Sequence, residues 1–265
     1  MKIILGQAYS FSQDGERDIQ EDSRYPSVDK PDKGQRFFLV CDGVGGCNKG
    51  EVASQTVCET FGKALAHAGF EKDFTNKDFQ HVLDKAYDAL DKKSDDDNEG
   101  MATTLTFVCF HQGGCTMAHI GDSRIYHIRP TEGILYRSDD HSLVNELVHH
   151  GVISPDEAID HPRKNVITRY MEAVDSTQNR SMATVMRTTN IMKGDYFFLC
   201  SDGVLCCVDE DELIEILSDS GKSDEEKLAV IAQKSVNSQD NNTAYLIPVA
   251  EVEGEEQTET EDEPT

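Results

Sequence analysis

Short runs of β-branched and aromatic residues recur along the chain and predict a protein rich in β-strands. These runs follow one another closely, as the strands of hairpins do, so neighbouring strands are expected to pair antiparallel. The predicted strands cover residues 3–10, 36–41, 103–110, 116–120, 124–129, 183–188, 196–200 and 243–249.

Helical periodicity occurs in groups between these runs. Residues 50–67 follow a glycine turn, and residues 77–92 carry apolar side chains at helical spacing, from Phe79 to Leu90. Further helices are predicted over 141–150 and, after a capping box that begins at Ser223, through Leu228 and Ile231. Paired helices between antiparallel strands predict an α+β fold, with sheets covered by helices.

The chain length of 265 residues suits one domain with a full core, which we assign to residues 1–250. Residues 151–182 show weaker periodicity and predict a loop-rich insertion near a site, with a short helix that starts at Ser154. The last fifteen residues hold eight acidic and no basic side chains. This composition predicts a disordered acidic tail over residues 251–265, which should add nothing to the melting temperature.

Composition narrows the class of protein. The formal net charge of −25 would repel a phosphate backbone, so nucleic acid is excluded as a partner. No apolar run approaches the roughly 20 residues that span a bilayer, and the N-terminus lacks the apolar region of a signal peptide. We therefore expect a monomer in the cytoplasm that contacts no membrane. Cys41, Cys109 and Cys200 lie inside predicted buried strands, which favours reduced thiols over disulfides or zinc.

Acidic residues stand where apolar strands end. Asp42, Asp122 and Asp202 each follow such a run and have a glycine beside them, and the pair Glu21-Asp22 and Asp240 add further carboxylates. Taken alone, an Asp-Gly pair is more often an ordinary turn. If these carboxylates converge, their repulsion requires cations, and an all-oxygen ligand set selects Mg²⁺, Mn²⁺ or Ca²⁺ over zinc.

The order of these motifs is more specific than any one of them. The chain reads GERDIQEDS at 15–23, CDGVGG at 41–46 with GEVAS at 50–54, ATTL at 102–105, GDSR at 121–124, DHSLV at 140–144, NVITR at 165–169, SDG at 201–203 and DNNT at 240–243. In this order the strings resemble the motifs of the protein phosphatase 2C family, over about residues 6–248. The resemblance implies metal-dependent hydrolysis of phosphoserine and phosphothreonine in proteins.

The resemblance also implies a fold and a set of roles. The expected fold is an α-β-β-α sandwich, two antiparallel sheets flanked by helix pairs, with the metals in a cleft at one end. Asp42 would bridge two Mn²⁺ or Mg²⁺ ions and the Gly43 carbonyl would bind the second, while Asp202 and Asp240 complete the first. Glu21 and Asp22 would hold metal-bound waters, Arg17 would bind the phosphate, and Asp122 would reach a third, weaker ion.

General chemistry supports such a site. Two divalent ions lower the pKa of a water that bridges them and offset charge on the phosphate oxygens, so no protein nucleophile is required. The planar guanidinium of Arg17 matches a phosphate better than a lysine would, and a surface salt bridge is the alternative role of this side chain.

Three positions depart from the family pattern. Val44 replaces the histidine that eukaryotic members use to protonate the leaving group, so the general acid is unassigned and water is a candidate. Gln20 and Ala102 replace the usual asparagine and glycine, and neither change touches an expected ligand. The pattern is typical of a stand-alone bacterial enzyme that opposes a serine/threonine kinase.

The sequence lacks the motifs of other phosphatase classes. No cysteine has an arginine six positions later, which excludes a cysteine-based phosphatase, and the run Asp95–Glu99 fits neither an aspartyl-phosphate motif nor a complete EF-hand. His141, His149, His150 and His161 are interpreted as solvated side chains and left out of the catalytic set. The alternative function is a non-catalytic pseudophosphatase that binds phosphoproteins or metal.

Overall fold

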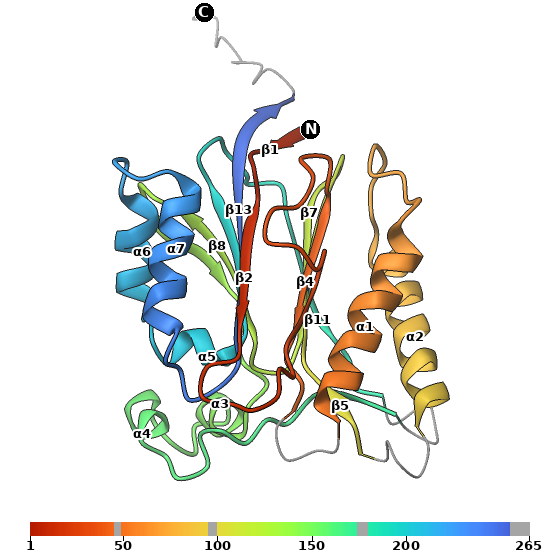
Figure 1. The fold of residues 1–265 in the computed structure, drawn as a ribbon, viewed down its shortest axis with the longest axis vertical. Coiled ribbons are helices and arrows are strands. Elements are labelled where there is room, and N and C mark those ends of the chain that lie inside the picture. Colours follow the sequence, from red (N-terminus) through yellow and green to blue (C-terminus); the bar gives the residue numbers. More distant parts are fainter. Residues whose placement is uncertain (45–48, 95–99, 174–179, 255–265) are drawn as a thin grey trace, which may run out of the picture.

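Two antiparallel sheets stacked face to face form the centre of the protein (Figure 1). The computed structural model describes residues 1–44, 49–94, 100–173 and 180–254. The strands are β1 (Lys2–Leu5), β2 (Tyr9–Gln13), β3 (Ser23–Tyr25), β4 (Phe37–Cys41), β5 (Ala102–Thr103), β6 (Leu105–His111), β7 (Gly114–Ile120), β8 (Arg124–Arg129), β9 (Gly133–Arg137), β10 (Met171–Glu172), β11 (Thr184–Thr188), β12 (Tyr196–Cys200) and β13 (Asn242–Glu253). One sheet has the order β1-β13-β12-β8-β9 with β2 also on β13, the second has the order β11-β7-β6-β4-β3, and β10 pairs with β5.

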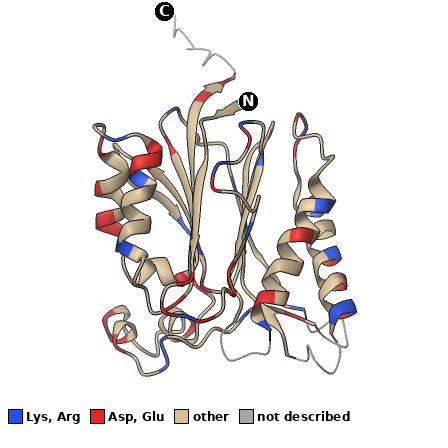
Figure 2. Cartoon of the chain, viewed as in Figure 1, with Lys and Arg blue, Asp and Glu red and all other residues tan. Residues whose placement is uncertain are grey.

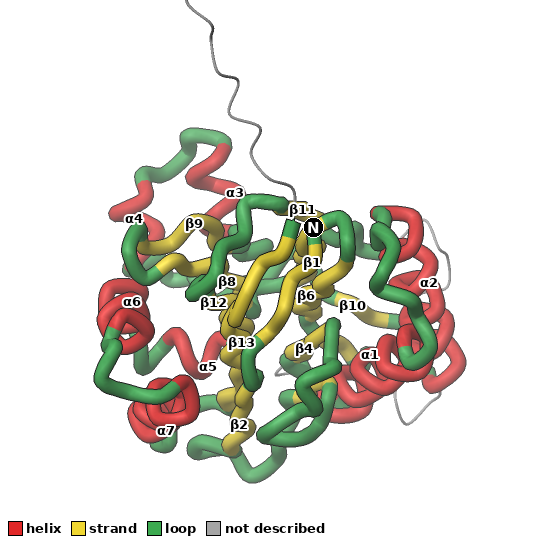
Figure 3. The backbone as a smooth tube through the Cα atoms, turned by 90° about the horizontal axis from the view of Figure 1, so that it is seen from above, coloured by secondary structure: helices red, strands yellow, loops and turns green. Residues whose placement is uncertain are grey.

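Helices cover both outer faces of the sandwich (Figure 3). The helices are α1 (Gly50–Leu65), α2 (Asn76–Lys93), α3 (Leu143–His149), α4 (Pro155–Ile159), α5 (Asp202–Leu205), α6 (Glu210–Ser218) and α7 (Asp224–Ser235). The pair α1 and α2 lies on the β11-β7-β6-β4-β3 sheet, and α6 and α7 lie on the other sheet, while α3 and α4 sit at one end (Figure 1). No helix in the described part of the chain combines the length and apolar composition needed to cross a membrane.

Strand β4 shows why its sequence is apolar without interruption. Phe37, Leu39 and Cys41 face the α1–α2 layer, whereas Phe38 and Val40 face the other sheet. Successive side chains of a strand point to opposite faces, so a strand buried on both faces has no polar positions. All five residues of β4 are at most 4% exposed. The sandwich therefore has three apolar layers, one between the sheets and one under each helix pair.

The structure confirms the predicted fold class and most of the predicted elements. The strands predicted over 124–129 and 196–200 have the observed bounds of β8 and β12. The run predicted over 3–10 is two strands, because Gly6 approaches Pro248 so closely that a Cβ would lie 2.9 Å from its Cγ. β1 and β2 consequently pair with different halves of β13.

Some elements were not predicted, and two predictions involve residues outside the described ranges. Helix α6 and strand β9 were missed; α6 lies within an acidic run and buries only Leu213 and Leu217. The helix predicted from Ser154 exists as α4, with both bonds of its capping box present. The acidic run at 95–99 lies outside the described residues, as do residues 174–179 of the insertion.

The boundary at residue 251 was wrong as a limit of the folded chain. Strand β13 continues to Glu253, where residues 251–253 pair with β1: Ile3 lies opposite Val252, and Lys2 opposite Glu253 with an Nζ–Oε2 distance of 2.7 Å. Val252 packs against the core between the sheets. At these three positions, strand pairing with β1 and the apolar packing of Val252 thus keep the chain folded despite its acidic composition. Residues 255–265 of the predicted tail lie outside the described residues.

Truncation at two points should separate strand from tail. Removal of all residues after Ala250 should lower the melting temperature by at least about 3 °C, because it deletes the partner of β1 and the Val252 contact. Removal of residues after Gly254 should change it by less than about 1 °C. Differential scanning calorimetry of the two truncated proteins and the full chain checks this. Equal melting temperatures for all three would show that residues 251–253 contribute nothing.

Candidate metal centre

Acidic residues follow strands of both sheets at one end of the sandwich, the end opposite to β1 (Figures 1 and 2). Asp42 directly follows β4, and Asp202 begins α5 just after β12. Asp240 lies two residues before β13, and Asp122 lies in the connection between β7 and β8. Figure 2 shows acidic residues in the loops at this end. The antiparallel pairing brings these strand ends together although they are far apart in the sequence.

A cleft of about 780 Å³ opens at this end. Its lining includes six of the eight candidate residues predicted from the sequence, namely Arg17, Asp42, Gly43, Asp122, Asp202 and Asp240. The other two lie beside it: the backbone oxygen of Glu21 accepts from the Gly43 amide at 3.1 Å, and Asp22 is 5% exposed. The structure therefore brings all eight candidates together.

The β5–β6 segment holds the Asp42-Gly43 backbone in place. The Asp42 amide donates to Thr104 Oγ1 at 3.0 Å, and the Asp42 carbonyl accepts from the Thr104 amide at 2.8 Å and from Thr103 Oγ1 at 2.9 Å. Gly43 has no room for a side chain, since a Cβ would lie 2.5 Å from the carbonyl carbon of Gly50. Position 43 therefore requires glycine, because it packs against the first residue of α1 beside the cleft.

Ser201 and Asn241 support the site but were not singled out from the sequence. Ser201 Oγ donates to Asp22 Oδ2 at 2.7 Å and accepts from the Thr243 amide at 2.9 Å. The Asn241 side chain accepts from the Glu21 amide and donates to a backbone oxygen, both at 2.9 Å. Each lies inside a motif string, next to Asp202 or Asp240, and this adjacency was the available signal.

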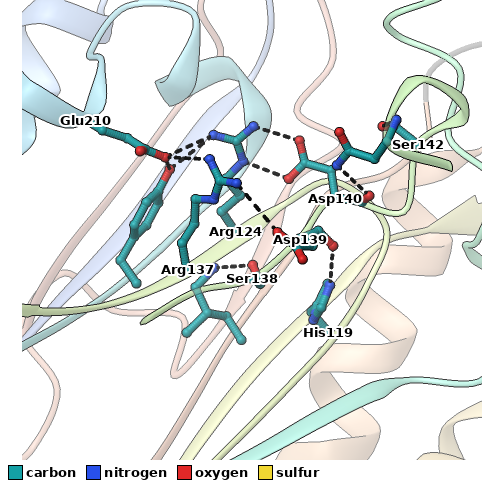
Figure 4. Close-up of polar contacts among 11 residues, drawn as sticks. His119, Arg124, Arg137, Ser138, Asp139, Asp140, Ser142 and Glu210 are labelled. Carbon is teal, nitrogen blue, oxygen red and sulfur yellow. Dashed lines mark hydrogen bonds and ion pairs between the residues drawn. The ribbon is translucent and has the colours of Figure 1, made fainter. Parts of the chain in front are cut away.

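The connection that carries Asp122 is fixed by a polar network (Figure 4). Arg124 Nε and Nη2 donate to the two carboxylate oxygens of Asp140, each at 2.7 Å. Ser123 Oγ bonds Thr104 Oγ1 at 2.8 Å. A bidentate arginine–carboxylate pair is rigid as well as strong. Asp122 therefore stands on a well-braced turn, and the same ion pair ties β8 to Asp140, shortly before α3.

His141 corrects an interpretation made from the sequence. It is not a solvated histidine on a helix face, since it precedes α3 and stacks on His119 with ring centroids 4.4 Å apart. Its Nδ1 accepts from the Gly121 amide at 3.1 Å. Burial, with a smaller contribution from His119, lowers the pKa of His141 to about 3. Its neutral ring braces the turn before Asp122.

The electrostatics of the cleft favour bound cations. Burial, followed by repulsion from Asp202 and Asp240, raises the pKa of Asp22 to about 7. Burial also raises the pKa of Asp42 and Asp202, again with repulsion from neighbouring carboxylates. Asp22 Oδ1 is buried without a hydrogen-bond partner. Carboxylates held together at this cost are stabilised when divalent cations neutralise them.

The ligand set fits Mg²⁺ or Mn²⁺, which prefer oxygen ligands. Within the described ranges, no group of three or more His, Cys, Asp and Glu side chains is arranged to hold an ion by itself. Mg²⁺ commonly binds through one or two carboxylates and keeps several waters, so it does not need a closed protein cage. The residues present are therefore compatible with hydrated ions held by carboxylates from both sheets.

Arg17 makes an ion pair within the site. Its Nη2 lies 2.7 Å from Asp240 Oδ2, and the two side chains are 45% and 40% exposed. The hydrogen bond to Asp240 and its charge raise the pKa of Arg17. The salt-bridge alternative to phosphate binding thus exists, but its partner is an expected metal ligand at the cleft and not an unrelated surface residue. The guanidinium lies at the rim of the cleft.

Comparisons with known proteins agree with this geometry. The family model described as protein phosphatase 2C matches residues 21–229. Protein phosphatase PhpP of Streptococcus pneumoniae is 31% identical over 225 residues, which cover 84% of this chain and 89% of that protein. The serine/threonine phosphatase PstP/Ppp of Mycobacterium tuberculosis has a similar crystal structure, with a TM-score of 0.76, 28% identity and coverage of 93% and 99% of the two chains.

The fold, the acidic cleft and these similarities define the class: this chain belongs to the protein phosphatase 2C family. The α-β-β-α sandwich expected from the resemblance is confirmed. The catalytic domain of the phosphatase PstP has been solved in complex with two manganese ions, and that structure has a TM-score of 0.73, 27% identity and coverage of 94% and 100%.

Asp122 provides a test of the electrostatics of the cleft. Burial, then repulsion from Asp202 and Asp140, raises its pKa to about 7. Between about pH 4 and 7 the folded protein retains a proton that the unfolded chain has released, so its stability falls as the pH rises. In EDTA, Asp122→Asn should therefore raise the melting temperature, and by more at pH 8 than at pH 5. Differential scanning fluorimetry at both pH values measures this.

The exposed Asp18 offers a matched control at the same end. Asp18→Asn should leave the melting temperature nearly unchanged at both pH values. Mn²⁺ should reduce the gain of Asp122→Asn, because bound cations offset the same repulsion. A loss of stability in Asp122→Asn at every pH would instead identify Asp122 as a turn cap, the alternative role of an aspartate at such a connection.

Proposed function

We propose that this protein hydrolyses phosphoserine and phosphothreonine in other proteins, with two Mg²⁺ or Mn²⁺ ions in the cleft. The observation that carries the proposal is the convergence of buried carboxylates from both sheets in a protein phosphatase 2C fold. Relatives from Listeria monocytogenes and Mycobacterium tuberculosis are named serine/threonine phosphatases. The motif carboxylates are all present, which favours an enzyme over a pseudophosphatase.

Each residue has a proposed role. Asp42 would be shared by the two ions, with the Gly43 carbonyl on one and Asp202 and Asp240 on the other; Glu21 and Asp22 would orient coordinated waters. Asp122, with Asp202, would reach a third ion. When bound, divalent ions would lower the pKa of a water so that it can attack the phosphate. They would also offset the negative charge on the phosphate oxygens. Arg17, at the rim, would bind the phosphate through its planar fork.

The chain's own residues prepare the reaction. Thr103 and Thr104 fix the Asp42 backbone, and Ser201 holds the Asp22 carboxylate with a hydrogen bond. Val44 lines the cleft and supplies no proton, so the leaving alkoxide is proposed to take its proton from water. An opposing serine/threonine kinase, the monomeric state, the cytoplasmic location and the single domain stay predictions from the sequence.

A direct assay decides between enzyme and pseudophosphatase. The purified protein should hydrolyse p-nitrophenyl phosphate and a phosphothreonine peptide in the presence of Mn²⁺, and EDTA should abolish both activities. Binding of the phosphopeptide without release of phosphate at any Mn²⁺ concentration would support the pseudophosphatase alternative.

Removal of single metal ligands should abolish turnover. Asp202→Asn and Asp240→Asn should each lower kcat by at least about 100-fold at saturating Mn²⁺, because each loses a charged oxygen ligand. Circular dichroism should show both variants folded. Asp211→Asn, at an exposed position of α6, is the matched control. If a folded variant keeps more than about a third of the wild-type kcat, its assignment as a ligand is wrong.

Arg17 should act mainly on phosphate binding. Arg17→Ala should raise KM and weaken inhibition by inorganic phosphate by about tenfold, because a charge-assisted bidentate contact is lost. Metal affinity should not fall, since the substitution removes a cation from Asp240. Arg17→Lys should restore only part of the phosphate affinity. An unchanged phosphate inhibition constant in Arg17→Ala would leave Arg17 with the salt bridge alone.

A further inference from the structure

Two arginines stand apart from the others in the chain. Of the ten arginines in the sequence, eight use their guanidinium groups in ion pairs or hydrogen bonds within the protein. The side chains of Arg163 and Arg169 have no such partner among the described residues, and both are exposed. A protein with a net charge of −25 offers many carboxylates, so two unpaired guanidinium groups six residues apart need an explanation.

Both arginines flank residues that line the catalytic cleft. Asn165 and Ile167 are part of its wall. Arg163 stands two residues before Asn165, and Arg169 stands two residues after Ile167. Lys164 lies close enough to the cleft residue Cys206 to lower its pKa, against the larger effect of burial. The charge of Arg169 likewise contributes to the lowered pKa of His141, after burial and His119. The His141 ring accepts a hydrogen bond from the Gly121 amide, in the turn before Asp122. The cationic segment thus runs along the rim of the cleft.

The backbone of this segment is pinned to the catalytic core. The Leu143 amide donates to the Val166 oxygen at 2.8 Å, and the Thr168 amide donates to the His141 oxygen at 2.7 Å. Residues 141–143 follow Asp140, which Arg124 holds in a bidentate pair. Figure 4 shows this pair beside the turn that leads to Ser142. The two free cations are therefore presented at a fixed position relative to the metal centre.

The charges of the cleft give these cations a specific use. The floor is acidic and, once loaded with divalent ions, suits the phosphate that is to be removed. Other anionic groups of a substrate would meet the surrounding acidic surface and be repelled. Guanidinium groups at the rim bind carboxylates or phosphates with planar hydrogen-bonding geometry, and they stay charged at all relevant pH values.

We propose that residues 163–169 form an anion-binding rim that selects phosphoproteins with acidic groups next to the phosphorylated residue. Arg163 and Arg169 would bind these groups, which are either carboxylates or a second phosphate, while the phosphorylated side chain enters the cleft between them and the aspartates. This proposal rests on the proposed function and specifies its substrate class.

The test compares matched phosphothreonine peptides. Four peptides share one length and differ only at two positions on each side of the phosphothreonine, which carry alanine, aspartate, phosphoserine or lysine. The value of kcat/KM is measured with Mn²⁺ for wild type and for Arg163→Gln/Arg169→Gln. Wild type should prefer the aspartate peptide over the lysine peptide by at least about threefold, and the double variant should lose about three- to tenfold on the anionic peptides relative to alanine.

A distant cation supplies the control. Lys193 is exposed and lies before β12, at the end of that strand remote from Asp202, so Lys193→Gln removes one positive charge without touching the rim. It should keep the wild-type order of peptides. A loss confined to the phosphoserine peptide would identify the bound group as a second phosphate, and a loss on both anionic peptides would show that carboxylates suffice. Both results support the rim, and the preference should weaken with added salt.

Two results would overturn the proposal. One is a wild-type preference for the lysine peptide over both anionic peptides, and the other is a double variant in which neither anionic peptide loses kcat/KM relative to the alanine peptide. These outcomes leave phosphatase activity itself intact. Failure of the proposed function has a different outcome, since no peptide and no p-nitrophenyl phosphate would then be hydrolysed with Mn²⁺.

Discussion

The mutual repulsion of buried carboxylates is the constraint on which the rest of this structure depends. Asp22 and Asp42 are held near Asp202 in an environment that disfavours their charged forms. Carboxylates in such positions either take up protons or need rigid structure to hold them and cations to neutralise them. The threonine and serine hydroxyls, the close glycine contacts and the bracing of the Asp122 turn serve the first need. In the proposed function, divalent metal serves the second.

The two-sheet architecture explains how the carboxylates of the cleft are held in fixed positions. Each sheet contributes strand ends to the same edge, and the apolar layer between the sheets fixes their separation. Phe38, Phe197 and Tyr245 fill this layer and are at most 1% exposed. Packing at the density of an organic crystal leaves little freedom for one sheet to slide over the other. The geometry of the cleft is therefore a property of the core as much as of the loops.

Much of the fold and site could be predicted from the sequence, because strand composition and the residues at strand ends are visible in short stretches of it. β12 is an uninterrupted apolar segment, β8 is rich in β-branched and aromatic residues, and Asp42 and Asp202 stand at strand ends beside glycine. What could not be predicted depends on partners far away in the chain. Nothing near Ser201 indicates that its hydroxyl meets Asp22, and nothing in the acidic C-terminal residues indicates that Val252 faces the sheet core. His141 was predicted to be solvated because its stacking partner, His119, lies on another element.

The pairing of β1 with the last part of β13 has a consequence for protein engineering. Lys2 and Glu253 are opposite each other on neighbouring strands, at the end of the sandwich far from the metal centre. A short glycine-rich linker would therefore join the two ends of the folded chain without crossing the cleft. The order of the chain is then open to circular permutation, with new ends placed in an exposed loop such as the one around Gly221.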